Sequence, residues 1–331
     1  SIEAHGAPWL CVAVASKPRA QQYLTTTLGS LLGGLTAEQV AQTRIKIVGS
    51  VPLEDYAELH PFLGRSGERL RPLVEFAPRP RDSEEHWVVA ENIDYAAALE
   101  ACGGGDFEHV LAIEDDAAAT AGVVDKLAAA IREVDRASAG AGGWKLLKLF
   151  VSEYFAGHWT WDLGSLSLLA ALPLAVGAVF ESLLRCAVGR KHGHDVCTFL
   201  VAFAFAASAA AYAVWAVGRA NFFPLFPLGV SRYTPSVGAC ASTVANLYPA
   251  GVASDLAQYL RTSCQPTDLA ICDFTAGRPS GVDCAGWSQP DDIKQWLYIP
   301  SLFQHIGRYS SIGHNEGSCV FTKTARTWRP A

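Results

Sequence analysis

Short apolar runs alternate with amphipathic stretches through the first half of the chain. Trp9 to Ala15 is apolar and partly β-branched, which predicts a buried strand. Leucines at helical spacing in QQYLTTTLGSLLGGL predict a helix that ends at Gly33 and Gly34. Arg44 to Val48 predicts a second strand. A strand, a helix and a strand in succession indicate a parallel pair, and therefore an α/β fold.

The central apolar run is His109 to Asp116, HVLAIEDD, in which apolar residues lead directly into Glu114, Asp115 and Asp116. Such a run predicts a buried strand, and ligands of open α/β sheets bind outside the carboxyl ends of strands. Adjacent carboxylates repel one another unless a cation lies between them. The run therefore predicts a divalent-metal site suited to bridging a nucleotide. The alternative is that Asp116 caps a helix formed by AAATAGVVDKLAAAIREV and that the other two acids are solvated.

Further helices and strands are predicted on both sides of this run. Ser83 to Cys102 favours a helix that ends in a run of glycines, whereas Arg65 to Arg81 is rich in Arg and Pro and predicts an irregular connection. In the last third we expect a short helix over Ala250 to Thr262 and a strand over Gln295 to Ile299. The segment WKLLKLFVSE is a further strand candidate, ending in Glu153.

Two long apolar runs, Leu163 to Phe180 and Val196 to Val217, interrupt the α/β pattern. The second carries no charged residue, and a helix needs about 20 such residues to cross a bilayer. Aromatic residues flank the pair, as at membrane interfaces, and a short basic connector of the kind that stays in the cytosol joins the two runs. We therefore predict a two-helix transmembrane hairpin. The alternative is a hairpin buried in a protein core.

A hairpin of this kind leaves the chain before and after it on the same side of the membrane, so it is an insertion into a globular domain. The predicted organisation is residues 1–162 as the N-terminal part of that domain, 163–217 as the hairpin, and 218–331 as its C-terminal part. Neither flanking part looks complete alone. We therefore expect the two parts to fold together.

The amino-acid composition argues against an ordinary soluble domain and against a nucleic-acid-binding protein. The chain is 50% apolar and 18% charged, with a mean hydropathy of +0.18, which is more apolar than an ordinary soluble domain. The net charge is −6 and no large basic cluster occurs, so nucleic acid is not an expected partner. The nine cysteines fit an oxidising compartment, and their odd number leaves at least one thiol without a partner in the chain. We expect Cys186 to be free, and the pairing remains open among Cys264, Cys272, Cys284 and Cys319.

Several segments together resemble the GT-A glycosyltransferases. They are SKPRAQQYLTTTLGSLL, IDYAAALEAC, VLAIEDDA, KLFVSE, CASTVANLYP and PSLFQHIGRYSS. A transmembrane hairpin inside the catalytic domain narrows the resemblance to the GPI-glycan N-acetylgalactosaminyltransferases, although several segments are also similar to the N-glycan branching N-acetylglucosaminyltransferases. The resemblance implies a GT-A-like, nucleotide-sugar-binding mixed sheet flanked by helices, with the hairpin inserted. It also implies an N-terminal membrane anchor ahead of the present chain.

The resemblance further implies a UDP-sugar donor, Mn²⁺ and inversion at the anomeric carbon. It assigns Glu114, Asp116 and His305 to the metal, with Glu114 also within reach of the ribose. Carboxylate oxygens and imidazole both suit Mn²⁺. The residues that it implies in donor binding are Ser16, Lys17, Pro18, Arg19, Asp94, Tyr95, Glu114 and Asp115. Relatives carry a basic residue just upstream of the Asp-Tyr pair, where this chain has Val-Ala-Glu at 89–91.

An inverting transfer needs a general base near the acceptor hydroxyl. Asp268, in QPTD, lies where the branching enzymes have a similar Pro-x-Asp segment, so it is the preferred candidate. Asp273 and Glu153 are the rivals. A surface helix cap is the alternative role of Asp268.

Three functions are consistent with these features. The first is a Golgi membrane enzyme that moves GalNAc from UDP-GalNAc to the first mannose of a GPI-anchor glycan, on a GPI-anchored protein or a GPI glycolipid. Its catalytic domain would be lumenal and its basic connector cytosolic, so that the hairpin holds the active site against the bilayer that carries the acceptor. The second is a UDP-GlcNAc-dependent N-glycan branching transferase, which a panel of UDP-sugars distinguishes. The third is a non-enzymatic membrane protein whose acids bind Ca²⁺, which would prefer Ca²⁺ to Mn²⁺ and would not bind UDP.

Overall fold

The chain divides into two compact units, of which the first combines Ser1–Ser152 with Val230–Ala331 and the second is Glu153–Gly229. The predicted boundaries of the insertion, 163 and 217, lie inside the second unit. The structure is a computed structural model, and it describes residues 8–17, 21–52, 55–56, 73–79, 87–105, 107–139, 143–150, 171, 173–180, 182–183, 186, 196–217, 232–235, 242–263, 265–277, 295–299 and 301–307.

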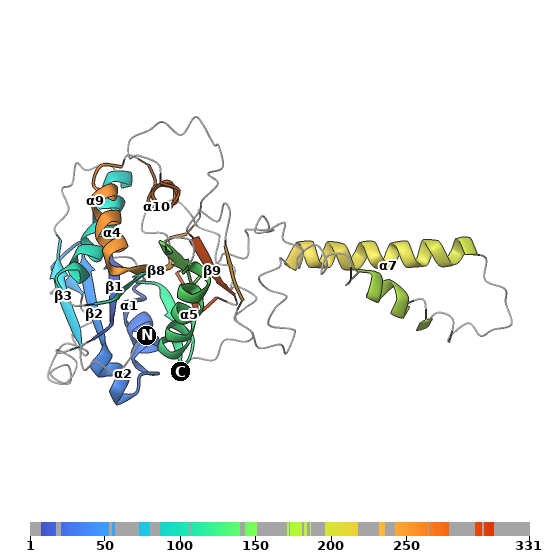
Figure 1. Ribbon diagram of the computed structural model, residues 1–331, viewed down its shortest axis with the longest axis horizontal. Helices are drawn as coiled ribbons and strands as arrows, with labels where there is room; N and C mark the ends of the chain where they lie inside the picture. Colours follow the sequence, from blue (N-terminus) through green and yellow to red (C-terminus); the bar gives the residue numbers. More distant parts are fainter. Residues whose placement is uncertain are drawn as a thin grey trace. The chain divides into compact units, whose positions relative to one another are not determined.

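The first unit is built on an eight-stranded mixed sheet in the order β3-β2-β1-β4-β8-β6-β9-β7 (Figure 1). These strands are β1 (Leu10–Ser16), β2 (Thr43–Gly49), β3 (Val74–Pro78), β4 (His109–Glu114), β6 (Leu146–Lys148), β7 (Arg232–Pro235), β8 (Ala245–Pro249) and β9 (Gln295–Ile299). Strand β1 lies between β2 and β4 and is parallel to both, so the predicted parallel opening is confirmed. Strand β8 comes from the chain after the second unit and pairs antiparallel with β4 and β6, so the two flanking parts complete one sheet.

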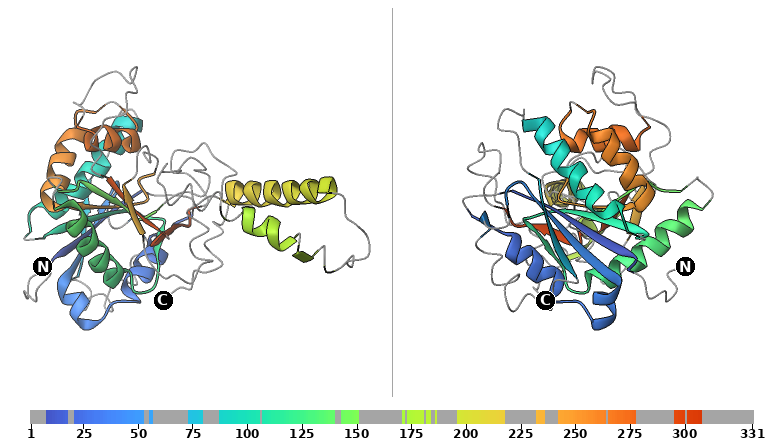
Figure 2. Two further views of the ribbon diagram at one scale, coloured as in Figure 1. Left: turned by 45° about the vertical axis from the view of Figure 1, so that its right-hand side comes forward. Right: turned by 90° about the vertical axis from the view of Figure 1, so that its left-hand side faces the viewer.

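Helices cover both faces of this sheet (Figure 2). One face carries α4 (Trp87–Gly103), α9 (Ala250–Leu260) and α10 (Thr267–Thr275), and the other carries α1 (Leu24–Leu32) and α5 (Val123–Ser138); α2 (Ala37–Gln42) precedes β2. Side chains of β1 alternate between the two cores, because Val12 and Val14 pack with α1 and α5 while Cys11 and Ala13 pack with α4 and α9. Burial on both faces explains why the central strands are unbroken apolar runs in the sequence.

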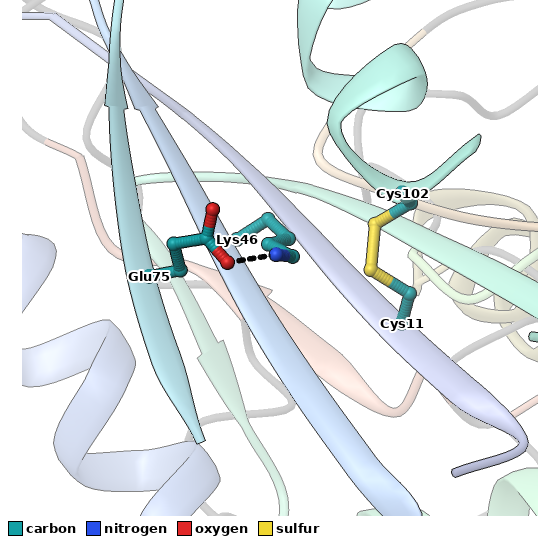
Figure 3. Close-up of a disulfide and its surroundings, with 4 residues drawn as sticks. All are labelled: Cys11, Lys46, Glu75 and Cys102. Atoms are coloured by element: carbon teal, nitrogen blue, oxygen red, sulfur yellow. Dashed lines mark hydrogen bonds and ion pairs between the residues drawn. A yellow bond between two sulfur atoms is a disulfide. The ribbon is translucent and has the colours of Figure 1, made fainter. Parts of the chain in front are cut away.

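A disulfide between Cys11 and Cys102 joins β1 to the end of α4, across a sequence separation of 91 residues (Figure 3). This pair was not among the expected partners. Cys272, which was among them, is also disulfide-bonded. Cys186 is free and exposed, as predicted. The disulfides agree with folding in an oxidising compartment.

Strand β3 corrects the prediction of an irregular connection over Arg65 to Arg81. It pairs parallel with β2, with Lys46 opposite Glu75, and these two side chains form an ion pair across the strands (Figure 3). Strand β3 is the last strand at its end of the sheet, and charged side chains are common on such edges. The Arg and Pro residues around this strand are typical of a loop, so the sequence did not predict it. The strand is seen only in its pairing with β2.

A second correction concerns the segment after the acidic run. The predicted helix from Ala117 begins only at Val123, with Gly122 in the left-handed conformation (φ 65°) before it. Instead, β5 (Ala117–Ala119) pairs antiparallel with β10 (Phe303–His305) in a separate two-stranded sheet. Three alanines favour a helix locally, but pairing with a distant strand decides their conformation. Asp116 is therefore not a helix cap.

The second unit contains α7 (Val196–Val217) and a helical segment over 173–180. The two helices are in close contact, because a Cβ added at Gly177 would lie 2.6 Å from the ring of Phe203. Among the described residues, no helix combines the length and the hydropathy that a membrane span requires, so the predicted pair of transmembrane helices is not confirmed. Most of the basic connector, including residues 187–195, lies outside the described residues.

Candidate functional site

The acidic turn between β4 and β5 lies at the carboxyl end of the central strand. Asp115 and Asp116 are almost fully buried, with 1% and 0% of their surfaces exposed. Asp115 points toward the end of β1, where its Oδ2 accepts hydrogen bonds from Ser16 Oγ (2.9 Å) and from the backbone N–H of Lys17 (3.0 Å). The β4–β5 turn and the loop that follows β1 are thus held together by one carboxylate.

His305 reaches this turn from the far end of the chain, because β10 pairs with β5 and sets His305 opposite Ala117. The imidazole Nε2 lies 3.2 Å from Asp116 Oδ2, and the backbone N–H of Ile306 donates to the carbonyl oxygen of Asp116 (2.8 Å). Gly307 leaves the space that the carboxylate fills, since a Cβ at this position would lie only 2.0 Å from Asp116 Oδ2. The backbone around His305 is therefore shaped to the Asp116 side chain.

Glu114, Asp116 and His305 form a candidate metal centre. One ligand atom from each lies within 4.8 Å of the others, which is close enough for one ion to contact all three. Thr243 Oγ1 donates a hydrogen bond to Glu114 Oε1 and orients that carboxylate. Two carboxylates and an imidazole are a donor set that Mn²⁺ accepts. The structure thus brings together the three residues to which the metal was assigned, and Thr243 is a neighbour that the sequence did not indicate.

The loop after β1 carries the first group of predicted donor-binding residues. Ser16 is buried, and its carbonyl oxygen accepts a hydrogen bond from Tyr56 Oη (3.0 Å). Together with the hydrogen bond from its hydroxyl to Asp115, this contact fixes its position. Lys17 is the last described residue of the loop, and Pro18 and Arg19 lie outside the described residues. The donor-binding roles of these residues, and that of Asp115, stay predictions.

Asp94, on α4, lies between two cations. Lys17 Nζ is 3.6 Å from Asp94 Oδ2, and Arg79 Nη1 donates to Asp94 Oδ1. Arg79 directly follows β3, in the stretch predicted to be an irregular connection, so it was not among the predicted site residues.

Tyr95 belongs to a buried network beneath the site. Its hydroxyl lies 3.0 Å from the hydroxyl of Tyr248 and accepts a hydrogen bond from Asn246 Nδ2 (3.3 Å). Burial, partly offset by these hydrogen bonds, raises the pKa of Tyr95 to about 12, so the hydroxyl stays neutral. The contacts described for Tyr95 are those of a packing residue, and its donor-binding role stays a prediction.

Asp268 lies in the first turn of α10 and is partly exposed. Its Oδ1 accepts a hydrogen bond from the backbone N–H of Leu269 (2.8 Å), which is the contact expected of an acid at a helix start. Lys148 on β6 is buried, and burial lowers its pKa to about 8 although the charge of Asp268 acts in the opposite direction. Lys148 is thus a buried cation whose charge interacts with Asp268, the preferred base.

The rival bases are placed differently. Asp273 is farther along α10, and its Oδ2 accepts a hydrogen bond from Gln265 Nε2 (2.9 Å). Glu153 lies outside the described residues. Asn92 Nδ2 donates to the carbonyl oxygen of Gln265 (2.8 Å), which ties the segment before α10 to the helix that carries Asp94. Of the three acids, Asp268 is the one at the start of α10.

Distant similarities to solved structures are with bacterial glycosyltransferases. Residues 1–349 of S. aureus TarS share 15% identity at a TM-score of 0.31, over 43% of this chain and 35% of that one. The same protein in complex with UDP-GlcNAc shares 14% identity at a TM-score of 0.30, over 43% of this chain and 34% of that one. The glycosyltransferase GlyE of Streptococcus pneumoniae TIGR4 shares 11% identity at a TM-score of 0.30, over 84% of this chain and 66% of that one. The chain spans about a third of the length of the TarS structures, and TM-scores of 0.30 and 0.31 are too low to assign a function.

Comparison of the sequence with protein families is decisive. No protein of curated function matches the chain significantly. The family described as GPI-N-acetylgalactosamine transferase PGAP4 matches residues 11–279, which include the β1 loop, Asp94, the acidic turn and Asp268. Because this match covers most of the chain, the protein belongs to the GPI-N-acetylgalactosamine transferase PGAP4 family.

Proposed function

We propose that this protein transfers GalNAc from UDP-GalNAc to the first mannose of a GPI-anchor glycan, with inversion and with the help of Mn²⁺. The observation that carries the proposal is the meeting of Glu114, Asp116 and His305 at the carboxyl end of β4, in a chain of this family. Asp116 and His305, which are 189 positions apart in the sequence, come together in this cluster.

The three side chains fit a cation that binds a nucleotide diphosphate. The cation, when bound, would neutralise negative charge that grows on the departing UDP. Gly307 leaves room for the Asp116 carboxylate, and Thr243 donates a hydrogen bond to Glu114. These contacts position two of the three proposed metal ligands.

Asp268 is the proposed general base. In an inverting transfer it accepts the proton of the mannose hydroxyl while the hydroxyl oxygen attacks the anomeric carbon and the bond from that carbon to UDP breaks. It lies in the first turn of α10, at the N-terminal end of the helix. Lys148, buried on β6, is close enough for its charge to interact with Asp268.

The lumen of the Golgi is the proposed compartment of the first unit, with the second unit in contact with the membrane. The Cys11–Cys102 disulfide supports an oxidising compartment. Exposed apolar side chains in the second unit, such as Val179, Leu183 and Phe205, support contact with lipid. Membrane contact would hold the active site close to a lipid-linked acceptor and raise its effective concentration.

The test is to measure transfer from UDP-GalNAc to a mannose-containing GPI glycan, and hydrolysis of free UDP-GalNAc, with the purified chain. We expect activity with Mn²⁺ and none in EDTA. Asp116→Ala and His305→Ala should each lower turnover by about a hundredfold or more, since a metal that stabilises transition-state charge contributes several kcal/mol. Full wild-type turnover in EDTA would refute the metal dependence. Faster transfer from UDP-GlcNAc than from UDP-GalNAc would favour the N-glycan branching transferase.

Gly307→Ala tests the metal centre without removing a ligand. The added methyl group would displace the Asp116 carboxylate, so Mn²⁺ affinity measured by calorimetry should fall by at least about tenfold. Gly251→Ala is the matched control, because no atom lies within 4 Å of a Cβ at that position on α9. Equal Mn²⁺ affinity of the two variants would show that Asp116 does not bind the ion.

A further inference from the structure

The inference concerns Asn92, a polar side chain of α4 that is completely buried, with 0% of its surface exposed. Its amide nitrogen Nδ2 donates two hydrogen bonds, one to the carbonyl oxygen of Ser263 (3.1 Å) and one to the carbonyl oxygen of Gln265 (2.8 Å). These acceptors are 171 and 173 positions away in the sequence, in the connection between α9 and α10. One side chain of α4 thus holds the segment that leads into α10.

Asn92 stabilises this arrangement through its two N–H groups. Its side-chain oxygen Oδ1 is buried and accepts no hydrogen bond within the described part of the chain. A buried acceptor without a partner costs free energy, and an apolar side chain of similar size would avoid that cost. The two donated hydrogen bonds are therefore what an asparagine contributes at this position.

The segment held by Asn92 fixes the start of α10. Gln265, whose carbonyl oxygen Asn92 contacts, also donates from its Nε2 to Asp273 Oδ2 on α10 (2.9 Å). The backbone N–H of Gln265 donates to Ser263 Oγ (3.3 Å) within the same connection. Asp268 is three residues beyond Gln265, in the first turn of α10. A shift of this connection would therefore move the carboxylate of Asp268.

Helix α4 links this connection to the acidic turn. Asn92 lies on the same side of α4 as Leu99, which is buried in the core that includes α9. Asp94 is two positions beyond Asn92, and residues two apart on a helix do not face the same way. Asp94 Oδ2 is 3.6 Å from Lys17 Nζ, and the backbone N–H of Lys17 donates to Asp115 in the acidic turn. A single helix thus connects the acidic turn with the start of α10.

Transfer of a sugar requires such a connection. A general base acts only within hydrogen-bond reach of the proton that it accepts. Under the proposed function the donor is bound at the acidic turn, whereas the proposed base is on α10, so the two are carried by different elements of the fold. A displacement of about 1 Å in the catalytic geometry can lower a rate by about a hundredfold.

We propose that Asn92 is a positioning residue for the transfer reaction. Its two hydrogen bonds hold the start of α10 so that Asp268 reaches the acceptor hydroxyl while the donor lies at the acidic turn. This inference rests on the proposed function, because it takes Asp268 as the general base. In this role Asn92 acts through Asp268 and contacts neither substrate.

The experiment measures GalNAc transfer from UDP-GalNAc to a mannose-containing GPI glycan with the full chain. Asn92→Leu replaces the amide with an apolar side chain of similar size and removes both donors. We expect kcat for transfer to fall by about 10- to 100-fold, because the base is displaced. The affinity for UDP in the presence of Mn²⁺, measured by calorimetry, should stay close to that of wild type, because the acidic turn is not altered.

A double-mutant cycle with Asp268→Asn distinguishes positioning from a general loss of structure. Asp268→Asn alone should lower transfer by about 100-fold or more, which is the contribution of a general base. Once the base is absent, Asn92→Leu should lower transfer by no more than about twofold further, because residues that act as a unit are not additive.

Gln39→Leu is the matched control. Gln39, on α2, is also a buried amide with two side-chain hydrogen bonds, one from the backbone N–H of Thr36 and one to Asp125 on α5. Neither α2 nor α5 carries a proposed site residue. Gln39→Leu should lower the thermal unfolding temperature as Asn92→Leu does, whereas its transfer rate per folded molecule should equal that of wild type.

A second variant provides the result if Asn92→Leu does not fold. Gln265→Ala removes the hydrogen bond from the same connection to Asp273 on α10. It should lower transfer in the same non-additive way with Asp268→Asn, although by less, because only one hydrogen bond is lost. Thermal unfolding should confirm that each variant is folded.

A failure of the proposed function would be distinct from a failure of the inference. If wild type transfers no GalNAc, the proposed function fails, and if Asp268→Asn is as fast as wild type, the base is misassigned and the inference falls with it. If Asp268→Asn is slow but Asn92→Leu and Gln265→Ala transfer at the wild-type rate, the inference alone is wrong. It is also wrong if the losses from Asn92→Leu and Asp268→Asn multiply, or if UDP affinity falls as much as transfer.

Discussion

The two units of the chain place their apolar residues in opposite environments. In the first unit, Leu111 and Ile113 of β4 are each 1% exposed, because helices cover both faces of the sheet. In the second unit, Leu200 and Phe205 of α7 are 56% and 74% exposed. The sequence of α7 is more apolar than that of β4, yet its side chains are more exposed, so composition alone does not decide burial.

The difference follows from how much surface each arrangement can cover. A two-sided sheet with helices on both faces encloses whole side chains. Two helices in contact, as at Gly177 and Phe203, cover only the strip between them. The described apolar residues outside that strip form a surface suited to an apolar partner such as lipid.

Cys102→Ser should lower the free energy of unfolding of the first unit by about 4 kcal/mol. The reason is that the disulfide with Cys11 closes a loop of 91 residues and restricts the unfolded chain. Denaturant unfolding under oxidising conditions measures this loss. Cys186→Ser, which removes a free and exposed thiol in the second unit, should change the value by no more than about 0.5 kcal/mol. An equal loss of unfolding free energy in both variants would show that the Cys11–Cys102 disulfide contributes no more to stability than the free thiol of Cys186.

Leu111→Ala and Leu200→Ala make the same change in the two environments. In β4 the loss of buried contacts and the cavity should cost about 3 kcal/mol. In α7 the leucine is mostly exposed, and the cost in detergent-free buffer should stay within about 0.5 kcal/mol. Denaturant midpoints of the two variants provide the comparison. A large loss from Leu200→Ala would mean that α7 is packed in a core.

Lys148→Met should stabilise the protein at neutral pH by about 2–3 kcal/mol, because burial of the lysine lowers its pKa from 10.5 to about 8. Between pH 8 and 10.5 the unfolded state binds more protons than the folded state, so wild-type stability rises with pH across this window. Below pH 8 the destabilisation is complete and constant. The gain from Lys148→Met should therefore shrink as the pH increases from 8 to 10.5, and a pH-independent gain would contradict the assignment.

Phe205→Ser should weaken binding to phospholipid vesicles by about 10- to 150-fold, because one large apolar side chain buried in lipid contributes roughly 1.5–3 kcal/mol. Vesicle flotation of the purified chain measures the effect. Val40→Ser is the control, since Val40 is a 39% exposed apolar residue of α2 in the first unit and should not contribute. Hydrolysis of free UDP-GalNAc should be unchanged in both variants. Equal vesicle binding of wild type and Phe205→Ser would exclude this face from membrane contact.

Much of the first unit could be predicted from local pattern. Strands β1, β2, β4 and β9 coincide with predicted apolar runs, and the helix expected over Ala250 to Thr262 is found as α9 (Ala250–Leu260). Strand β3 was missed because its charged and proline-rich neighbours resemble a loop, and its pairing partner β2 is distant in the sequence. Strand β5 was assigned to a helix because three alanines have helical propensity until β10 pairs with them.

The sequence by itself determined the α/β alternation, the acidic end of β4 and the resemblance that assigned His305 to the metal. These properties depend on hydrophobic periodicity and short motifs, which act over a few residues. Only the tertiary structure decided that His305 meets Asp116, that Arg79 pairs with Asp94, and that Cys11 bonds to Cys102. Each of these contacts joins separate elements of the fold, so it is fixed by strand pairing and helix packing rather than by local propensity.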